Sequence, residues 1–183
     1  MEKESLLKHI EEQSLISFTG KINVLKSDNN QHIGVVFLKE GEIIDCSYFG
    51  RTGKKGLFAL VFEEIGSQEF HKFVIEPEII KDSQVKFNYS FDEFYQKVQE
   101  RYEVYQKIKR LRPPSYLKLS IDPNFIKPKC QIKIDGFEFD VLSAMVNAKK
   151  VPDIYVNCPL YDYEITGALI SLRKKKAIRV IGP

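Results

Sequence analysis

The most constraining feature of this chain is an ordered series of strand, turn and helix signals in its first half. Apolar and polar residues alternate from Phe18, and residues 33–38 are strongly apolar, which is typical of neighbouring half-buried strands. Glu40-Gly41 then permits a tight reversal, because glycine adopts a positive φ at little cost. A third strand over residues 42–49 and a helix over 56–65 follow. This order predicts an antiparallel sheet with a packed helix.

Two further elements complete this half of the chain. Leu6, Leu7 and Ile10 share one face of a predicted helix over residues 4–13. Phe70 and Phe73 lie in a further predicted strand that would close the sheet. The sequence therefore predicts an α+β domain.

The same residues resemble a known family. Thr19-Gly20, the strand that leads into Gly41, and Gly56 with Ala59 resemble, in order, the signature of the PATAN family, also catalogued as the DUF4388 domain. The resemblance covers residues 4–76 approximately. It implies a bacterial signalling module without chemistry of its own, whose partners are response regulators or small Ras-like GTPases.

The pattern changes near Ser90, where Ser90 and Glu93 form a predicted capping box for a long helix. Pro113-Pro114 ends this helix, which we expect to pack on the sheet. Beyond it, a helix, a short helix, a third helix and a strand look like a winged helix-turn-helix. The predicted organisation is a PATAN-like domain over residues 1–89, a connecting helix over 90–113, a linker or extended arm over 114–134, and a winged-helix-like domain over 135–183.

Charge and cysteine usage limit the class of protein. The formal net charge is only +3, so binding to nucleic acid would need a local basic patch. Met1-Glu2-Lys3-Glu4 lacks the features of a secretory signal, and no apolar run could cross a bilayer. Cys46, Cys130 and Cys158 are odd in number and widely spaced, which favours buried thiols in a reducing compartment. We predict a cytoplasmic protein without membrane insertion.

The sequence offers no catalytic constellation. His9, His32 and His71 are scattered, and none stands at a metal-ligand spacing with cysteines or carboxylates, so surface positions are expected. We predict no catalytic residue, no metal site, no cofactor and no enzymatic activity.

One candidate contact site is the glycine-rich loop over residues 50–56. It resembles a phosphate-binding loop, but two residues instead of four separate its first glycine from the Gly-Lys pair. We interpret it as a flexible strand-to-helix loop and a partner-contact site through Arg51, Lys54 and Lys55.

The other candidate is a basic turn near the end of the sequence. Its residues are candidates for contact with nucleic acid or with a protein partner: Arg173, Lys174, Lys175, Lys176 and Arg179. Two observations disfavour DNA. The start of the predicted recognition helix carries Asp162 and Glu164, which would repel phosphates, and no second wing strand follows the last strand.

The function that we favour is a non-enzymatic adaptor that binds another signalling protein. The alternative is a transcription regulator that binds DNA through its winged-helix-like domain. A homodimer through the connecting helix, whose tyrosines suit an interface, is also kept as a hypothesis.

Overall fold

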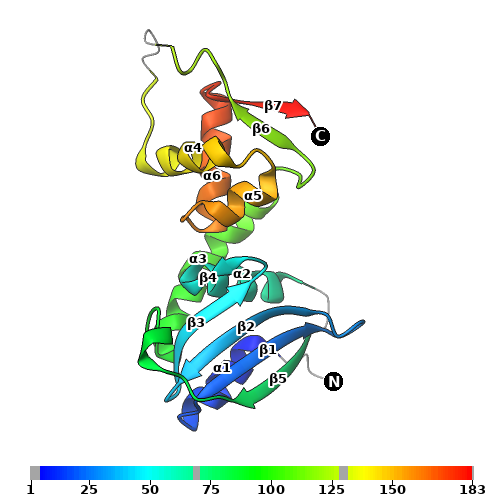
Figure 1. Ribbon diagram of the computed structural model, residues 1–183, viewed down its shortest axis with the longest axis vertical. Helices are drawn as coiled ribbons and strands as arrows, with labels where there is room; N and C mark the ends of the chain where they lie inside the picture. The colour runs from blue at the N-terminus through cyan, green and yellow to red at the C-terminus, as the bar shows by residue number, and fades with distance from the viewer. Residues whose placement is uncertain (1–4, 68–70, 128–131, 183) are drawn as a thin grey trace. The chain divides into compact units, whose positions relative to one another are not determined.

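The computed structural model describes residues 5–67, 71–127 and 132–182. They form an α+β structure, and the chain divides into two compact units, Met1–Glu103 and Val104–Pro183 (Figure 1). No described helix has both the length and the apolar content needed to span a membrane. The elements of the first unit are α1 (Leu6–Leu15), β1 (Gly20–Lys26), β2 (His32–Lys39), β3 (Glu42–Tyr48), β4 (Arg51–Thr52), α2 (Gly53–Gly66), β5 (His71–Pro77), a 3₁₀ turn η1 (Asp82–Gln84) and most of α3 (Phe91–Lys109).

The sheet of the first unit is antiparallel throughout, with the strand order β4-β3-β2-β1-β5. β5 closes the sheet beside β1, as predicted, although Phe70 lies outside the described residues. Glu40 (φ 52°) and Gly41 (φ 82°) both have positive φ, the conformation of a type I′ turn that matches the twist of a hairpin. A Cβ atom on Gly41 would lie 2.7 Å from the carbonyl oxygen of Ser14, so only glycine fits this turn.

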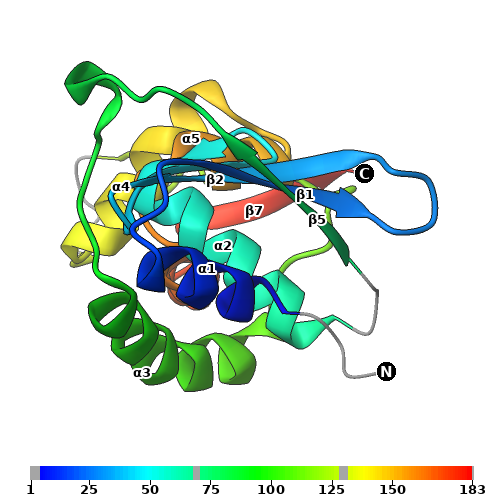
Figure 2. The ribbon, with the colours of Figure 1, turned by 90° about the horizontal axis from the view of Figure 1, so that it is seen from below.

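The helices of this unit form successive layers. α1 and α2 lie on the same side of the sheet, and α3 lies beyond them (Figure 2). Phe94 of α3 packs on Phe58 of α2, with ring centroids 5.4 Å apart, and Tyr102 packs on Phe62 at 5.6 Å. These aromatic side chains of α3 pack on α2 and not on the sheet, so the expectation that α3 packs on the sheet is wrong for them. α2 is buried on two sides and lies between these side chains and the strands.

One local prediction needs correction, and another is confirmed in part. α2 begins at Gly53, so the predicted flexible loop is a short strand followed directly by the first turn of a helix. The start of α3 is as predicted: the Glu93 amide donates to Ser90 Oγ at 3.3 Å, and Tyr89 packs near Phe94.

The second unit contains the end of α3 followed by β6 (Lys118–Ile121), α4 (Gly136–Asn147), α5 (Val151–Asn157), α6 (Asp162–Lys174) and β7 (Ile178–Gly182). The three helices and the final strand appear where the sequence predicts them. β6 lies inside the stretch interpreted as a linker or extended arm, and it pairs with β7 in an antiparallel sheet. The final strand thus has a partner that precedes the helices instead of following it.

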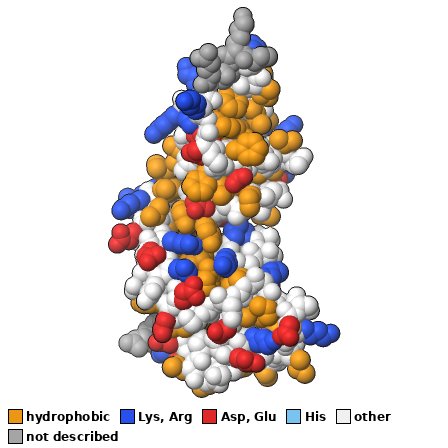
Figure 3. Space-filling view, turned by 90° about the vertical axis from the view of Figure 1, so that its left-hand side faces the viewer, with side chains coloured by type: hydrophobic (Ala, Val, Ile, Leu, Met, Phe, Trp, Pro, Cys, Tyr) orange, Lys and Arg blue, Asp and Glu red, His pale blue; other side chains and the backbone are white. Residues whose placement is uncertain are grey.

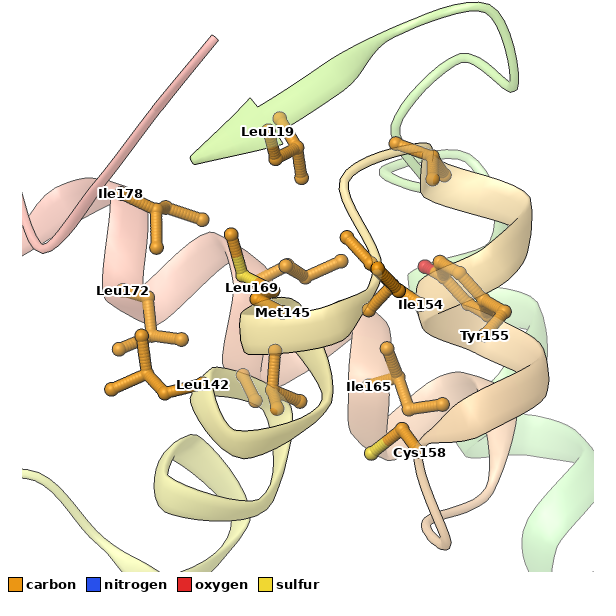
Figure 4. Packing of buried hydrophobic residues seen from close by; sticks show 14 of the residues in the cluster. Leu119, Leu142, Met145, Ile154, Tyr155, Cys158, Ile165, Leu169, Leu172 and Ile178 are labelled. Atoms are coloured by element: carbon orange, nitrogen blue, oxygen red, sulfur yellow. The ribbon is translucent and has the colours of Figure 1, made fainter. Parts of the chain in front are cut away.

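The helices and the small sheet of this unit enclose their own core (Figure 4). Tyr155 is fully buried, and its hydroxyl lies 2.6 Å from Thr166 Oγ1. Other buried members include Leu119, Val141, Met145, Ile154, Ile165, Leu169, Leu172 and Ile178. The second unit therefore has the separate core expected of an independent domain.

Candidate functional site

The feature of the second unit that best fits a binding site is an apolar pocket bordered by arginines. Its apolar lining comes from β6, α6 and β7, through Leu119, Leu169 and Val180 among others. Arg112, Arg173 and Arg179 also line it. Hydrophobic side chains beside lysines and arginines occur elsewhere on the surface (Figure 3). The pocket therefore differs from these places in its concave apolar lining and not in its composition.

The volume of the pocket sets what it can hold. It measures about 180 Å³. Drug-sized ligands and cofactors occupy clefts of roughly 300–1,000 Å³, whereas a cavity of about 150 Å³ holds a single benzene ring. The pocket is therefore suited to one large apolar side chain.

The end of α6 sets the position of two of the arginines. The amide of Lys176 donates to the Arg173 carbonyl at 3.0 Å, and the amide of Ala177 donates to the Leu172 carbonyl at 2.9 Å. Lys176 has a φ of 55°, so the chain reverses there and β7 begins within two residues. This reversal brings Arg173 on α6 and Arg179 on β7 to the same pocket.

The third arginine has structural partners. The Arg112 guanidinium lies 4.2 Å from the centroid of the Tyr155 ring, and it forms an ion pair with Asp162 at 3.5 Å. The Asp162 side chain is only 12% exposed, and Glu164 accepts from the backbone amide of Tyr161. Both acids at the start of α6 therefore have structural partners, which weakens the argument that they repel a nucleic acid.

Arg173 and Arg179 differ from Arg112 in this respect. Both are exposed. Within the part of the chain that the structure describes, neither has an acidic partner at ion-pair distance. Their charges are available to a negatively charged ligand.

Lys175 has a structural role, in contrast to its neighbours. Its ammonium lies 2.6 Å from Glu138 Oε2 and donates to the carbonyl of Lys133 at 2.9 Å. Burial raises the pKa of Glu138, but Lys175, the Ser171 hydroxyl and the Asp135 backbone outweigh it and hold that pKa below its ordinary value. The prediction of Lys175 as a contact residue therefore meets a competing role, since this ion pair joins the start of α4 to the end of α6.

Lys174 and Lys176 are exposed and do not line the pocket. The basic turn thus contains three kinds of residue: the pocket arginines, an ion-paired lysine and two surface lysines. This division offers matched controls for experiments.

The other predicted contact site, around residues 50–56, is less open than expected. Arg51 is only 9% exposed, so the expectation that it stands on the surface is wrong. Lys54 lies over the Tyr89 ring at 4.7 Å, and Lys55 is half-buried. The Gly53 amide donates to Asp45 Oδ1 at 3.1 Å, which fixes the start of α2. Arg51 and Lys55 are therefore at least partly buried in the fold, whereas Lys54 remains exposed.

The three histidines lie on different elements, as predicted: His9 is in α1, His32 in β2 and His71 in β5. His9 is not on the surface as expected: its side chain is 16% exposed and its ring lies 4.7 Å from that of Phe73. Among the described residues no group of three or more His, Cys, Asp or Glu could hold a metal ion. Cys46 and Cys158 are buried, as predicted, and burial raises the pKa of Cys46; Cys130 lies outside the described residues.

Reasoning from the sequence missed the part of the pocket that precedes α4. Arg112, which follows the end of α3, lines it together with Leu117 and Leu119 from a stretch interpreted as a linker. The alternation of Leu117, Leu119 and Ile121 with polar residues is the signal that could have revealed β6.

No protein-family model, curated protein or solved structure matches this chain. The resemblance to the PATAN family therefore stays a prediction that rests on the residues quoted for it.

Proposed function

We propose that this chain is a non-enzymatic signalling adaptor that binds other proteins, and that the pocket of the second unit receives an apolar side chain of the partner. The observation that supports this proposal is the pocket itself: an apolar hollow of about 180 Å³ beside Arg173 and Arg179. An apolar side chain flanked by carboxylates would bury its surface in the hollow and pair with the arginines. Arginine is also enriched at the energetically dominant positions of protein interfaces.

The resemblance of residues 4–76 to PATAN modules adds the partner classes to test first. These are bacterial response regulators and small Ras-like GTPases.

The second candidate function is a transcription regulator that binds DNA through the second unit. The exposed Lys174 and Lys176 favour it, together with the arrangement of α4, α5 and α6 and the pairing of the acids at the start of α6. Lysines on a surface attract phosphates without regard to sequence, so this binding would fall steeply with salt.

A comparison of two double variants in one pull-down separates the two functions. R173E/R179E reverses the charges at the pocket, and K174E/K176E makes the same change in net charge on the adjacent surface. Tagged full-length proteins are incubated with extract of the native host, with and without nuclease, and bound proteins are identified by mass spectrometry.

The adaptor proposal expects a partner that survives nuclease and is lost with R173E/R179E but kept with K174E/K176E. Partners that disappear with nuclease, and that both double variants lose equally, would refute the adaptor proposal in favour of DNA binding.

A further inference from the structure

We infer that β7 takes up an extended segment of the partner as an added strand, in which apolar and acidic residues alternate. This inference rests on the proposed function, because it states how the partner of the pocket would bind. It assigns the specificity to one edge of the small sheet.

β7 has one open edge. It pairs with β6 on one side only, and no described strand lies on its other side (Figure 1). The backbone amides and carbonyls on such an edge form a template for another strand, and proteins commonly protect it with lysine, proline, a bulge or a covering element. The register of the small sheet is irregular where Lys118 pairs with Gly182 and Leu119 with Val180, so Ile181 is an extra, bulged residue on β7. Before this bulge, over residues 178–180, β7 pairs with β6 in regular register and its described residues include no lysine and no proline.

Exposed apolar residues accompany this edge. Val180 is 43% exposed and Ile181 is 46% exposed, and they are neighbours on β7. Because Ile181 is the bulged residue, the regular alternation of faces holds only up to Val180, and both exposed side chains lie near the end of this edge. A strand added here would cover part of both.

The alternation along β7 sets the pattern of the partner. Ile178 and Val180 share one face of the strand and Arg179 has the alternate position, and all three residues line the pocket. Residues directly opposite each other on paired strands interact through their side chains, and opposite charges there are favourable. The fitting partner strand therefore has apolar residues opposite Ile178 and Val180 and an acidic residue opposite Arg179, with a further acid near Arg173.

Charge distinguishes this occupant from a second copy of the chain. Two copies of β7 paired edge to edge would bring two sets of Arg173 and Arg179 into one interface. Like charges in such a place are destabilising, whereas an acidic strand neutralises them. The same charges would attract nucleic acid, but the open strand edge and the apolar hollow serve no purpose for a phosphate backbone.

The test uses a fluorescent peptide of alternating valine and glutamate, long enough to pair with all of β7, and measures its anisotropy with the full-length protein. The parent peptide is compared with two forms that are N-methylated either on every valine or on every glutamate. Each form keeps the side chains but blocks hydrogen bonding along one edge of the peptide. R173E/R179E and K174E/K176E are measured alongside.

The expected result is saturable binding of the parent peptide and a loss of at least about tenfold, or 1.4 kcal/mol, for one methylated form but not the other. R173E/R179E should lose binding to this peptide and gain it for a peptide of alternating valine and lysine, whereas K174E/K176E should keep the original preference.

Three results would overturn the inference. Equal binding of all three peptides would show that the backbone edge is not used, and the proposed function would stand. No binding of the parent peptide, while R173E/R179E still loses a protein partner in the pull-down, would reject strand addition alone. Displacement of the peptide by duplex DNA, with both double variants equally impaired, would reject the inference together with the adaptor function.

Discussion

Replacing Lys175 by methionine is expected to destabilise the second unit, whereas the same replacement at Lys174 is not. Methionine keeps the length of the side chain but removes its charge. At position 175 it leaves the Glu138 carboxylate, whose side chain is 1% exposed, without the ammonium 2.6 Å away. Lys174 is exposed and forms no ion pair among the described residues, so the matched replacement loses nothing comparable.

The magnitude follows from the burial of the two partners. Removing one partner of a fully buried ion pair costs about 3–5 kcal/mol. Lys175 keeps 33% of its side chain exposed, so solvent screens part of the interaction. We therefore expect a loss of about 2 kcal/mol, which for a domain of this size corresponds to a fall in Tm of roughly 8–16 °C. The Lys174→Met variant should stay within about 0.5 kcal/mol of the parent.

The assay is urea unfolding of the full-length chain, combined with hydrogen exchange of the amides in α4 and α6. Hydrogen exchange reports the stability of these helices even if the two units unfold separately. Exchange in α4 and α6 should accelerate in Lys175→Met and stay unchanged in Lys174→Met.

A double-mutant cycle supplies the decisive comparison. When Glu138→Gln is combined with Lys175→Met, much of the lost stability should return, because the uncompensated carboxylate is gone. Equal stability of Lys174→Met and Lys175→Met, or additive losses in the double variant, would refute the structural role of this ion pair.

Three further predictions concern stability. Gly41→Ala should cost about 2–4 kcal/mol in urea unfolding, because a left-handed φ and contact with the Ser14 carbonyl act together, whereas Gly53→Ala, with open space around it, should cost only about 1 kcal/mol. Tyr155→Phe removes a buried hydrogen bond and should cost about 1 kcal/mol by the same measurement; an unchanged midpoint would show that the bond contributes nothing. The folded-state pKa of Glu138 lies below its ordinary value of 4.5, so its carboxylate contributes fully to stability above pH 4.5 and this contribution is lost as the pH falls further. In acid titrations Glu138→Gln should flatten the dependence of stability on pH. An unchanged slope would contradict this prediction.

Much of the first unit could be predicted because its signals are local. The Glu40-Gly41 reversal needs two positive φ angles, and the glycine in the sequence marks the position of one of them. The contact partner of α3 could not be predicted in this way. The apolar face of α3 indicates that it is buried. Whether this face meets the sheet or α2 depends on Phe58 and Phe62, which α2 presents to α3 on its side away from the sheet.

The candidate site was only partly predictable for a similar reason. Arg173, Lys175 and Arg179 belong to one basic run, and the run does not show that one of them pairs with a carboxylate on another helix. Likewise, Leu119 of β6 reaches the pocket because β6 pairs with β7 across a long separation in sequence. Pairings of this kind follow from the tertiary fold and leave no local pattern.

Site-specific photocrosslinking in the native host can show whether a protein partner binds at the pocket. A photoreactive amino acid replaces Val180 at the pocket, and in a control protein it replaces Val146 of α4, which is 68% exposed and does not line the pocket. If a partner binds at the pocket, position 180 should give a discrete protein adduct that resists nuclease and is absent from position 146. Equal adducts from both positions, or an adduct at 180 that nuclease removes, would contradict this prediction.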